Sequence, residues 1–357
     1  MNGIAILLLK ILFLYLTLYI INLIMKITIV KGNEFAIVEK RVSMKHLSSD
    51  KLIALNGESG FEADILKPGV YLKNKFIYRI HKFPLIHINP DEIAYVVSHS
   101  GESSTNKHII ENISSNNFQD TKLFLDNKGH TGIQRDVLTA GTYSINLAQF
   151  SIITKSKIIS LYPEKFFSIV DKIKKHEGFS LTEIKENEIG IVTKMNFTKE
   201  NEQTILTKGF YPINCLFDKV DKYPRGEFII SWSYLKTGDY SLDVLDIITK
   251  DGFLVKIEIF LLLQIKDIKL VKNYFSNMSE LLNKHLNIFI MEYFNNILQD
   301  QTLSNLITNR KTIFKDIEYD FSKKTNKLNL QLKNLFINFS NLYENKNVNL
   351  YNILDKK

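Results

Sequence analysis

The chain has 357 residues, of which 45% are hydrophobic and 24% are charged, a balance typical of a folded protein with a sizeable core. Its net charge of +8 is spread along the sequence, without a block of basic residues or a zinc-finger or RNP motif, so we expect no binding to nucleic acid. The single cysteine, Cys215, excludes an intramolecular disulfide and leaves the redox compartment open.

Residues 4–25 form an apolar run with one charge, Lys10. A helix of this length spans roughly 33 Å, about the thickness of a bilayer's hydrocarbon layer, and Lys10 lies near one end, where its stem can snorkel. The sequence therefore predicts a transmembrane anchor over residues 1–26. The alternative is a cleaved signal peptide, but no basic segment precedes the run and no A-x-A-like site follows before Lys26.

Basic residues follow the apolar run and are absent before Lys10. By the positive-inside rule this asymmetry predicts a single-pass protein with most of its chain in the cytoplasm, although Lys10 favours the opposite orientation. Each of these cations could also contribute up to about 1 kcal/mol of attraction to an anionic leaflet. Whether they bind the membrane or only set the topology stays open. The membrane-proximal set is Lys26, Lys31, Lys40, Arg41 and Lys45.

One phrase occurs three times, as "ADILKPGVYLKN" (63–74), "RDVLTAGTYSIN" (135–146) and "QTILTKGFYPIN" (203–214). The copies share a Leu, a Gly three residues later, a Tyr two residues after the Gly and an Asn three residues further. A strand-like phrase precedes each copy, "NEFAIVEKR" (33–41), "DEIAYVVSHSG" (91–101) and "NEIGIVTKM" (187–195). The pattern predicts three small β modules in tandem.

The repeated glycines, Gly69, Gly141 and Gly209, are expected to supply a turn conformation that other residues resist. The repeated tyrosines, Tyr71, Tyr143 and Tyr211, are expected to pack on the half-buried face of the returning strand. The role of these residues is therefore structural and not catalytic. In the second module, residues 112–132 predict a loop with a short helix.

The carboxy-terminal half predicts an α+β layer. A strict alternation over 255–265 follows the turn "KDG" (250–252) and indicates a long antiparallel strand. Helical spacing begins near Ser279, a second amphipathic helix runs from Leu306 to Phe321, and alternation returns over 327–339. Helices on one face of an antiparallel sheet are the expected arrangement.

The segment "SLDVLDIITKDGFLVKIEIFLLLQIKD" (241–267) resembles the core of the SPFH (band 7) family, which includes stomatins, prohibitins and flotillins. "ILTKGFYPINCLFDKV" (205–220) stands where that family has an L-x-P-G-x-Y turn, although only the first copy of the repeat keeps the proline. The parts that contain "NEFAIVEKR" and "NFQDTKLFLDNKGHTG" are similar to the extended amino-terminal region of larger bacterial flotillin-like members. The resemblance covers residues 33–340.

We therefore expect an anchor (1–26), a tandem β-module region (33–186), an SPFH domain (187–340) and a short polar tail (341–357). Relatives usually continue into a long coiled coil, whereas the tail is rich in Asn and lacks sustained heptads, so the oligomerisation that the coil provides is not implied here. The resemblance implies a non-enzymatic, membrane-anchored scaffold. It would form homo-oligomers and organise membrane lipids or membrane-protein clients.

The sequence contains no recognisable catalytic or cofactor motif. The eight histidines show no metal-ligand spacing, and neither a G-x-S-x-G sequence nor a glycine-rich phosphate loop is present, so we expect no enzyme, cofactor or metal. One alternative is a membrane-bound, metal-dependent hydrolase that uses His81 and His87. Another is a secreted or periplasmic binding protein with a cleaved leader. Cys215 is predicted to be a small buried hydrophobe in a strand.

Overall fold

The computed structural model describes residues 2–48, 51–102, 115–161, 167–194 and 203–343. The fold is α+β, as predicted, with many small sheets and few helices. The chain divides into two compact units. Unit 1 comprises residues 1–183, 194–202 and 210–219, and unit 2 comprises residues 184–193, 203–209 and 220–357. The predicted tail lies mostly outside the described residues.

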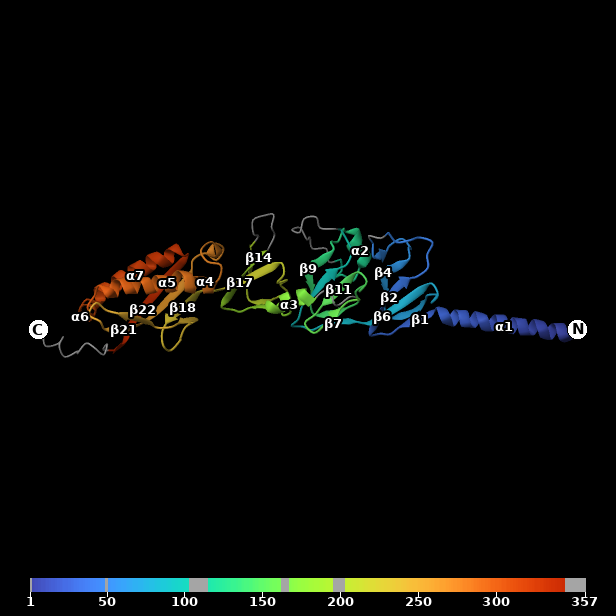
Figure 1. The fold of residues 1–357 in the computed structure, drawn as a ribbon, viewed down its shortest axis with the longest axis horizontal. Coiled ribbons are helices and arrows are strands. Elements are labelled where there is room, and N and C mark those ends of the chain that lie inside the picture. Colours follow the sequence, from blue (N-terminus) through green and yellow to red (C-terminus); the bar gives the residue numbers. More distant parts are fainter. Residues whose placement is uncertain (1, 49–50, 103–114, 162–166, 195–202, 344–357) are drawn as a thin grey trace. The chain divides into compact units, whose positions relative to one another are not determined.

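The first element is a helix, α1 (Asn2–Lys26), which confirms the helical prediction for residues 4–25 (Figure 1). Its large apolar side chains between Leu7 and Tyr19 are exposed on every side of the helix. In the part of the chain whose side chains are described, no helix meets the combined length and hydropathy of a membrane span.

Three β modules with the same strand order follow α1. The first contains β1 (Ile27–Val30), β2 (Glu34–Lys40), β3 (Ile53–Ala54), β4 (Gly60–Leu66), β5 (Gly69–Leu72) and β6 (Tyr78–Pro84). The second contains β7 (Ile86–Ile88), β8 (Ala94–Ser98), α2 (Thr121–Asp126), β9 (Gly132–Leu138), β10 (Gly141–Tyr143), β11 (Phe150–Ile153), β12 (Ile158–Ile159) and α3 (Phe167–Lys175). The third contains β13 (Thr182–Ile184), β14 (Glu188–Lys194), β15 (Gln203–Leu206), β16 (Gly209–Tyr211) and β17 (Asp218–Pro224).

The modules share one topology. A three-stranded core is ordered β4-β2-β6 in the first module, β9-β8-β11 in the second and β15-β14-β17 in the third. The short leading strand pairs with the strand after the repeated glycine, as β1 with β5, β7 with β10 and β13 with β16. The tandem β modules expected from the repeated phrases are therefore present, and the short helix predicted within 112–132 is α2.

The central strand of the first module, β2, is buried on both faces. Its apolar residues are consecutive, and Phe35, Ala36, Ile37 and Val38 are all fully buried. Phe35 and Ile37 belong to one hydrophobic cluster, whereas Ala36 and Val38 belong to another on the opposite face. Because β1 and β5 cover the second face of the sheet, the strand is buried on both sides, and the simple alternation of a half-buried strand does not apply.

In unit 2 a five-stranded sheet holds the largest core. Its strands are β18 (Glu227–Trp232), β19 (Tyr240–Leu242), β20 (Leu245–Ile248), β21 (Leu254–Ile265) and β22 (Leu330–Tyr343). The predicted strand after the "KDG" turn is β21, and it pairs in antiparallel fashion with β18, β20 and β22. The expectation of an antiparallel sheet fails at one edge, where β18 and β19 are parallel. The Asp239 side chain, directly before β19, accepts the Ile229 N–H at 2.7 Å and so ties this return to β18.

Helices cover one face of this sheet, as expected (Figure 1). They are α4 (Met278–Glu280), a π-helical turn (Leu281–Leu286), α5 (Asn287–Gln299), α6 (Leu303–Thr308) and α7 (Arg310–Lys327), after a 3-10 turn (Val271–Asn273). Two details differ from the prediction. The first helix is capped by Asn277 and not by Ser279, and the second amphipathic helix is interrupted at Asn309.

The cap at the start of α4 predicts a pH effect. Asn277 Oδ1 accepts the Glu280 N–H at 2.9 Å, while Glu280 Oε2 accepts the Ser276 N–H at 2.8 Å. The bond from Ser276, together with the bond from Lys284 Nζ to Glu280 Oε1 at 3.3 Å, lowers the pKa of Glu280 to about 2. A lowered carboxyl pKa stabilises the fold above the unfolded pKa of about 4.3 and loses that contribution as the pH falls towards 2.

We therefore expect Glu280→Gln to unfold at a lower temperature than the original chain at pH 6. This difference in melting temperature should disappear between pH 4 and pH 2. The single tryptophan, Trp232, is fully buried in unit 2, so its fluorescence reports the melting of this unit. A gap that stays constant down to pH 2 would show that the Glu280 carboxylate does not act through its ionised form.

Candidate functional site

The repeated Gly-Tyr pair builds the same turn in the modules. Gly69, Gly141 and Gly209 have φ angles of +157°, +158° and +157°, a region that favours glycine. The Tyr143 ring folds back over Gly141, and its hydroxyl donates to the Thr139 carbonyl at 2.9 Å. Tyr71 makes the same bond to Lys67 at 2.8 Å. The tyrosine ring thus packs across its own turn, whereas the sequence predicted that it packs on the half-buried face of the returning strand.

This geometry predicts that Gly141→Ala destabilises unit 1. A Cβ at Gly141 would lie 3.1 Å from the Tyr143 ring, whereas a Cβ at Gly69 would lie at an ordinary 3.5 Å from Tyr71. Because the two φ angles are the same, Gly69→Ala carries the backbone strain without the crowding. We expect losses of about 2 kcal/mol for Gly141→Ala and about 1 kcal/mol for Gly69→Ala, measured by amide hydrogen exchange of β9 and β4. An equal or larger loss for Gly69→Ala would contradict the role of the ring.

The repeated asparagine has a role that the sequence did not indicate. In each module its side-chain oxygen accepts the N–H two residues ahead, as in Asn74 to Phe76 at 3.0 Å, Asn146 to Ala148 at 3.1 Å and Asn214 to Leu216 at 3.1 Å. This bond closes the turn before the last core strand of the module. The only sequence signal was the constant distance of five residues from the repeated glycine.

The amide group of the same asparagine reaches the preceding module. Asn146 Nδ2 donates to the Glu62 and Ala63 carbonyls on β4, at 2.9 and 3.0 Å. Asn214 Nδ2 donates in the same way to the Gln134 and Arg135 carbonyls on β9, at 3.1 and 2.8 Å. Asn146 is fully buried and Asn214 is 3% exposed, so both junctions exclude water. Consecutive modules are therefore joined by a repeated polar link.

The two junctions differ beside this link. Ala63 and Phe150 are buried in one apolar cluster at the first junction. The equivalent positions at the second junction are Arg135 and Asp218, whose side chains form a mostly buried ion pair at 2.5 Å. Burial raises the pKa of Asp218, although the Arg135 guanidinium acts in the opposite direction. The second junction is therefore ionic where the first is apolar.

The structure does not bring the five predicted membrane-proximal cations together. Lys40 and Lys45 donate to backbone carbonyls of a loop, at Gly57 and Asn56. Arg41, by contrast, lines a pocket with Lys75, Arg79 and Lys82, three cations that the sequence did not single out. They lie 34 to 41 positions beyond Arg41, and only the tertiary structure places them in one pocket with Ile27, Thr28 and Ile29 at the end of α1.

The histidines proposed for a metal site have separate partners. His81 Nε2 lies 2.8 Å from Glu39 Oε2, whereas His87 Nδ1 lies 3.2 Å from Thr142 Oγ1 on β10. Within the described residues, no three His, Cys, Asp or Glu side chains gather in a way that could hold a metal ion. Cys215 lies in the turn before β17 and not in a strand, because Asn214 closes that turn, and it is half-buried beside the Tyr95 hydroxyl at 3.3 Å.

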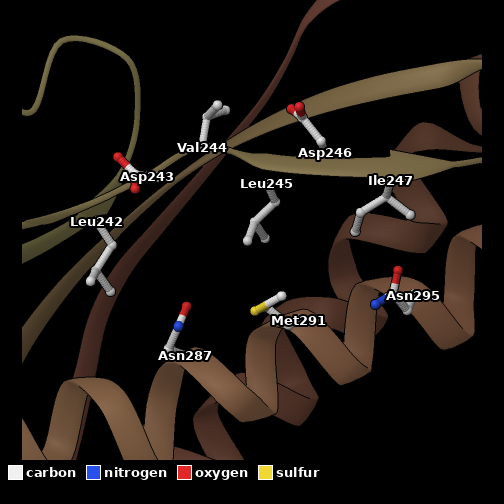
Figure 2. A pocket seen from close by; sticks show the side chains of 9 residues that line it. All are labelled: Leu242, Asp243, Val244, Leu245, Asp246, Ile247, Asn287, Met291 and Asn295. Atoms are coloured by element: carbon white, nitrogen blue, oxygen red, sulfur yellow. The ribbon is translucent and has the colours of Figure 1, made fainter.

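Unit 2 has a pocket of about 230 Å³ between residues 242–247 and α5. Figure 2 shows Leu245 and Met291 facing one another across it, with Asn287 and Asn295 projecting from the helix. Two of the polar side chains at its rim already have partners. Asn287 accepts the Trp232 indole N–H at 3.0 Å, and Asp243 forms an ion pair with Lys236 at 3.3 Å. The pocket is therefore lined by both polar and apolar side chains, and two of its polar side chains already have partners within the chain.

Residues 182–344 match the model of the SPFH domain / Band 7 family. The matched range begins at β13 and so includes the third β module together with the five-stranded sheet and its helices. No match was found among curated proteins.

Proposed function

Because this chain belongs to the SPFH/band 7 family through residues 182–344, we propose that it is a non-enzymatic scaffold that is anchored in a membrane by α1. It assembles with copies of itself on the membrane surface and organises partner proteins or lipid microdomains there. The family match carries this proposal, since members are generally scaffolds without enzymatic activity and are often associated with membranes.

The surface of α1 supports the membrane part of the proposal. A helix that exposes apolar side chains on all sides is suited to an apolar environment and not to water. The 25 residues of α1 extend about 37 Å, enough to cross the hydrocarbon layer. The charge asymmetry around the helix supports an orientation with the three modules and the SPFH domain in the cytoplasm.

The linked modules support the scaffold part. Within unit 1, buried asparagines join the second module to the first and residues 210–219 to the second module, so these parts of unit 1 pack against one another. Such an arrangement behaves like a repeat protein, in which neighbouring units stabilise one another.

The anchor is tested by alkaline carbonate extraction of membranes that contain the full chain. We expect the protein to stay in the membrane pellet. Leu12→Arg should release much of it, because a central arginine costs about 2.5–3.5 kcal/mol in a spanning helix, while Leu12→Ile serves as the matched control. Complete release of the original chain by carbonate would overturn the anchor.

The scaffold is tested by mass photometry of the full chain after mild detergent extraction. We expect a distribution of oligomers above the mass of one chain. A strict monomer at every concentration would overturn self-assembly, and this result is independent of the extraction experiment.

A further inference from the structure

The first module has a cationic pocket of about 370 Å³ immediately after α1. It lies between β1 and β6, and β6 is the edge strand of its sheet. Arg41, Lys75, Arg79 and Lys82 line it, and all four side chains are exposed. In the described part of the chain no carboxylate lies within ion-pair distance of any of them, so the four cations are not held in ion pairs there.

A buried hydroxyl without a partner lies in the same pocket. Thr28 is only 6% exposed, and its Oγ1 has no hydrogen-bond partner among the described residues. Strand alternation places Thr28 on the inner side of β1 together with Val30, which packs in the cluster between the two sheets. A buried polar group is normally satisfied, so this hydroxyl indicates that a hydrogen-bonding ligand completes the site.

The second module shows that the fold does not require these residues. Thr28 pairs with Tyr71, and the residue that pairs with the equivalent Tyr143 is Ile86, which is apolar and buried. The positions equivalent to Lys75, Arg79 and Lys82 hold Leu147, Ser151 and Thr154, and β12 covers the edge strand there. The open edge, the cations and the hydroxyl therefore occur together in the module next to α1.

We propose that this pocket binds the phosphate group of an anionic phospholipid, an inference that rests on the membrane anchor proposed above. The pocket begins at Ile27, directly after α1, so its lining residues on β1 lie within about 10 Å of the helix end. Arginine guanidinium groups and lysine ammonium groups bind phosphate oxygens by charge-assisted hydrogen bonds, and Thr28 supplies a hydroxyl donor. The site fixes one headgroup beside the anchor and draws anionic lipid to each copy of the scaffold.

The test uses the full chain in nonionic detergent micelles that contain either phosphatidic acid or phosphatidylcholine, with bound lipid counted by native mass spectrometry. We expect phosphatidic acid to be retained and phosphatidylcholine to be lost. The triple variant Lys75→Gln, Arg79→Gln, Lys82→Gln should bind phosphatidic acid about tenfold more weakly. Removing the same number of exposed cations from the end of α3, at Lys172, Lys174 and Lys175, should leave binding unchanged.

Thr28→Val separates a ligand site from a packing defect. Valine keeps the shape of threonine, so the variant should melt at a higher temperature without lipid, because the unpartnered hydroxyl is gone, and should bind phosphatidic acid several-fold more weakly. Unchanged binding of phosphatidic acid in Thr28→Val would show that the Thr28 hydroxyl does not contact the ligand, which contradicts its proposed role. If the pocket variant and the α3 variant lose the same amount of affinity for phosphatidic acid, binding depends on general charge and the proposal is overturned.

A parallel titration with inorganic phosphate distinguishes the source of the ligand. Inorganic phosphate that binds as tightly as phosphatidic acid would assign the pocket to a free phosphate and overturn the lipid headgroup. Carbonate extraction of the triple pocket variant is expected to match that of the original chain, since α1 is intact. The anchor and the pocket can therefore fail separately.

Discussion

Replacing Lys272 with Met should destabilise unit 2 by about 3 to 5 kcal/mol, because it removes one partner of a buried ion pair with Asp221. Lys272 Nζ lies 2.8 Å from Asp221 Oδ2, and the two side chains are 13% and 7% exposed. Lys272 also donates to the Thr193 hydroxyl. This group connects β17 and β14 of the third module to the 3-10 turn that follows β21, so its loss should loosen the module within the SPFH domain.

Trp232 fluorescence measures this loss during unfolding by urea or heat. Lys208→Met is the matched control, since Lys208 and Glu186 also pair at 3.0 Å but are 65% and 81% exposed. An exposed pair contributes about 0–1 kcal/mol, so the control should unfold almost like the original chain.

The double variant Asp221→Asn, Lys272→Met removes both charges of the pair and should recover much of the stability. If it is no more stable than Lys272→Met alone, the loss arises from packing and not from the charge.

Asn146→Ala should destabilise the junction between the first and second modules by about 3 kcal/mol. The substitution leaves the Glu62 and Ala63 carbonyls and the Ala148 N–H without their partner, in a place that water does not reach. Each unsatisfied buried group costs about 1–3 kcal/mol, and local relaxation reduces the sum. Hydrogen exchange of β4 and β10 should accelerate by about 100-fold, since a tenfold change corresponds to about 1.4 kcal/mol.

Asn74→Ala supplies the control from within the chain. Asn74 closes the same turn through Phe76, but it belongs to the first module and is only half-buried. We expect a loss of about 1 kcal/mol, the contribution of the turn bond alone. Similar losses at Asn74 and Asn146 would show that the asparagine acts within its own module and not as a link between modules.

The sequence by itself determined the elements whose signals are local. The apolar run over 4–25 specified a helix, and the alternation over 255–265 specified β21, because the period of apolar residues follows directly from helix and strand geometry. The repeated Gly-Tyr phrase specified three copies of one β unit. The segments 205–220 and 241–267 resembled the SPFH family, and the family match over residues 182–344 confirms this resemblance.

Only the tertiary structure decided which side chains meet across the fold. The amide of Asn146 finds carbonyls 83 and 84 positions away, and Lys75, Arg79 and Lys82 reach the end of α1 because β6 returns to it. Of the predicted membrane-proximal cations, only Arg41 lines that pocket. Sequence periodicity records which face of an element is buried, but it does not record which distant element covers that face. The links between modules and the cationic pocket depend on those long-range contacts, so they became visible only in the folded chain.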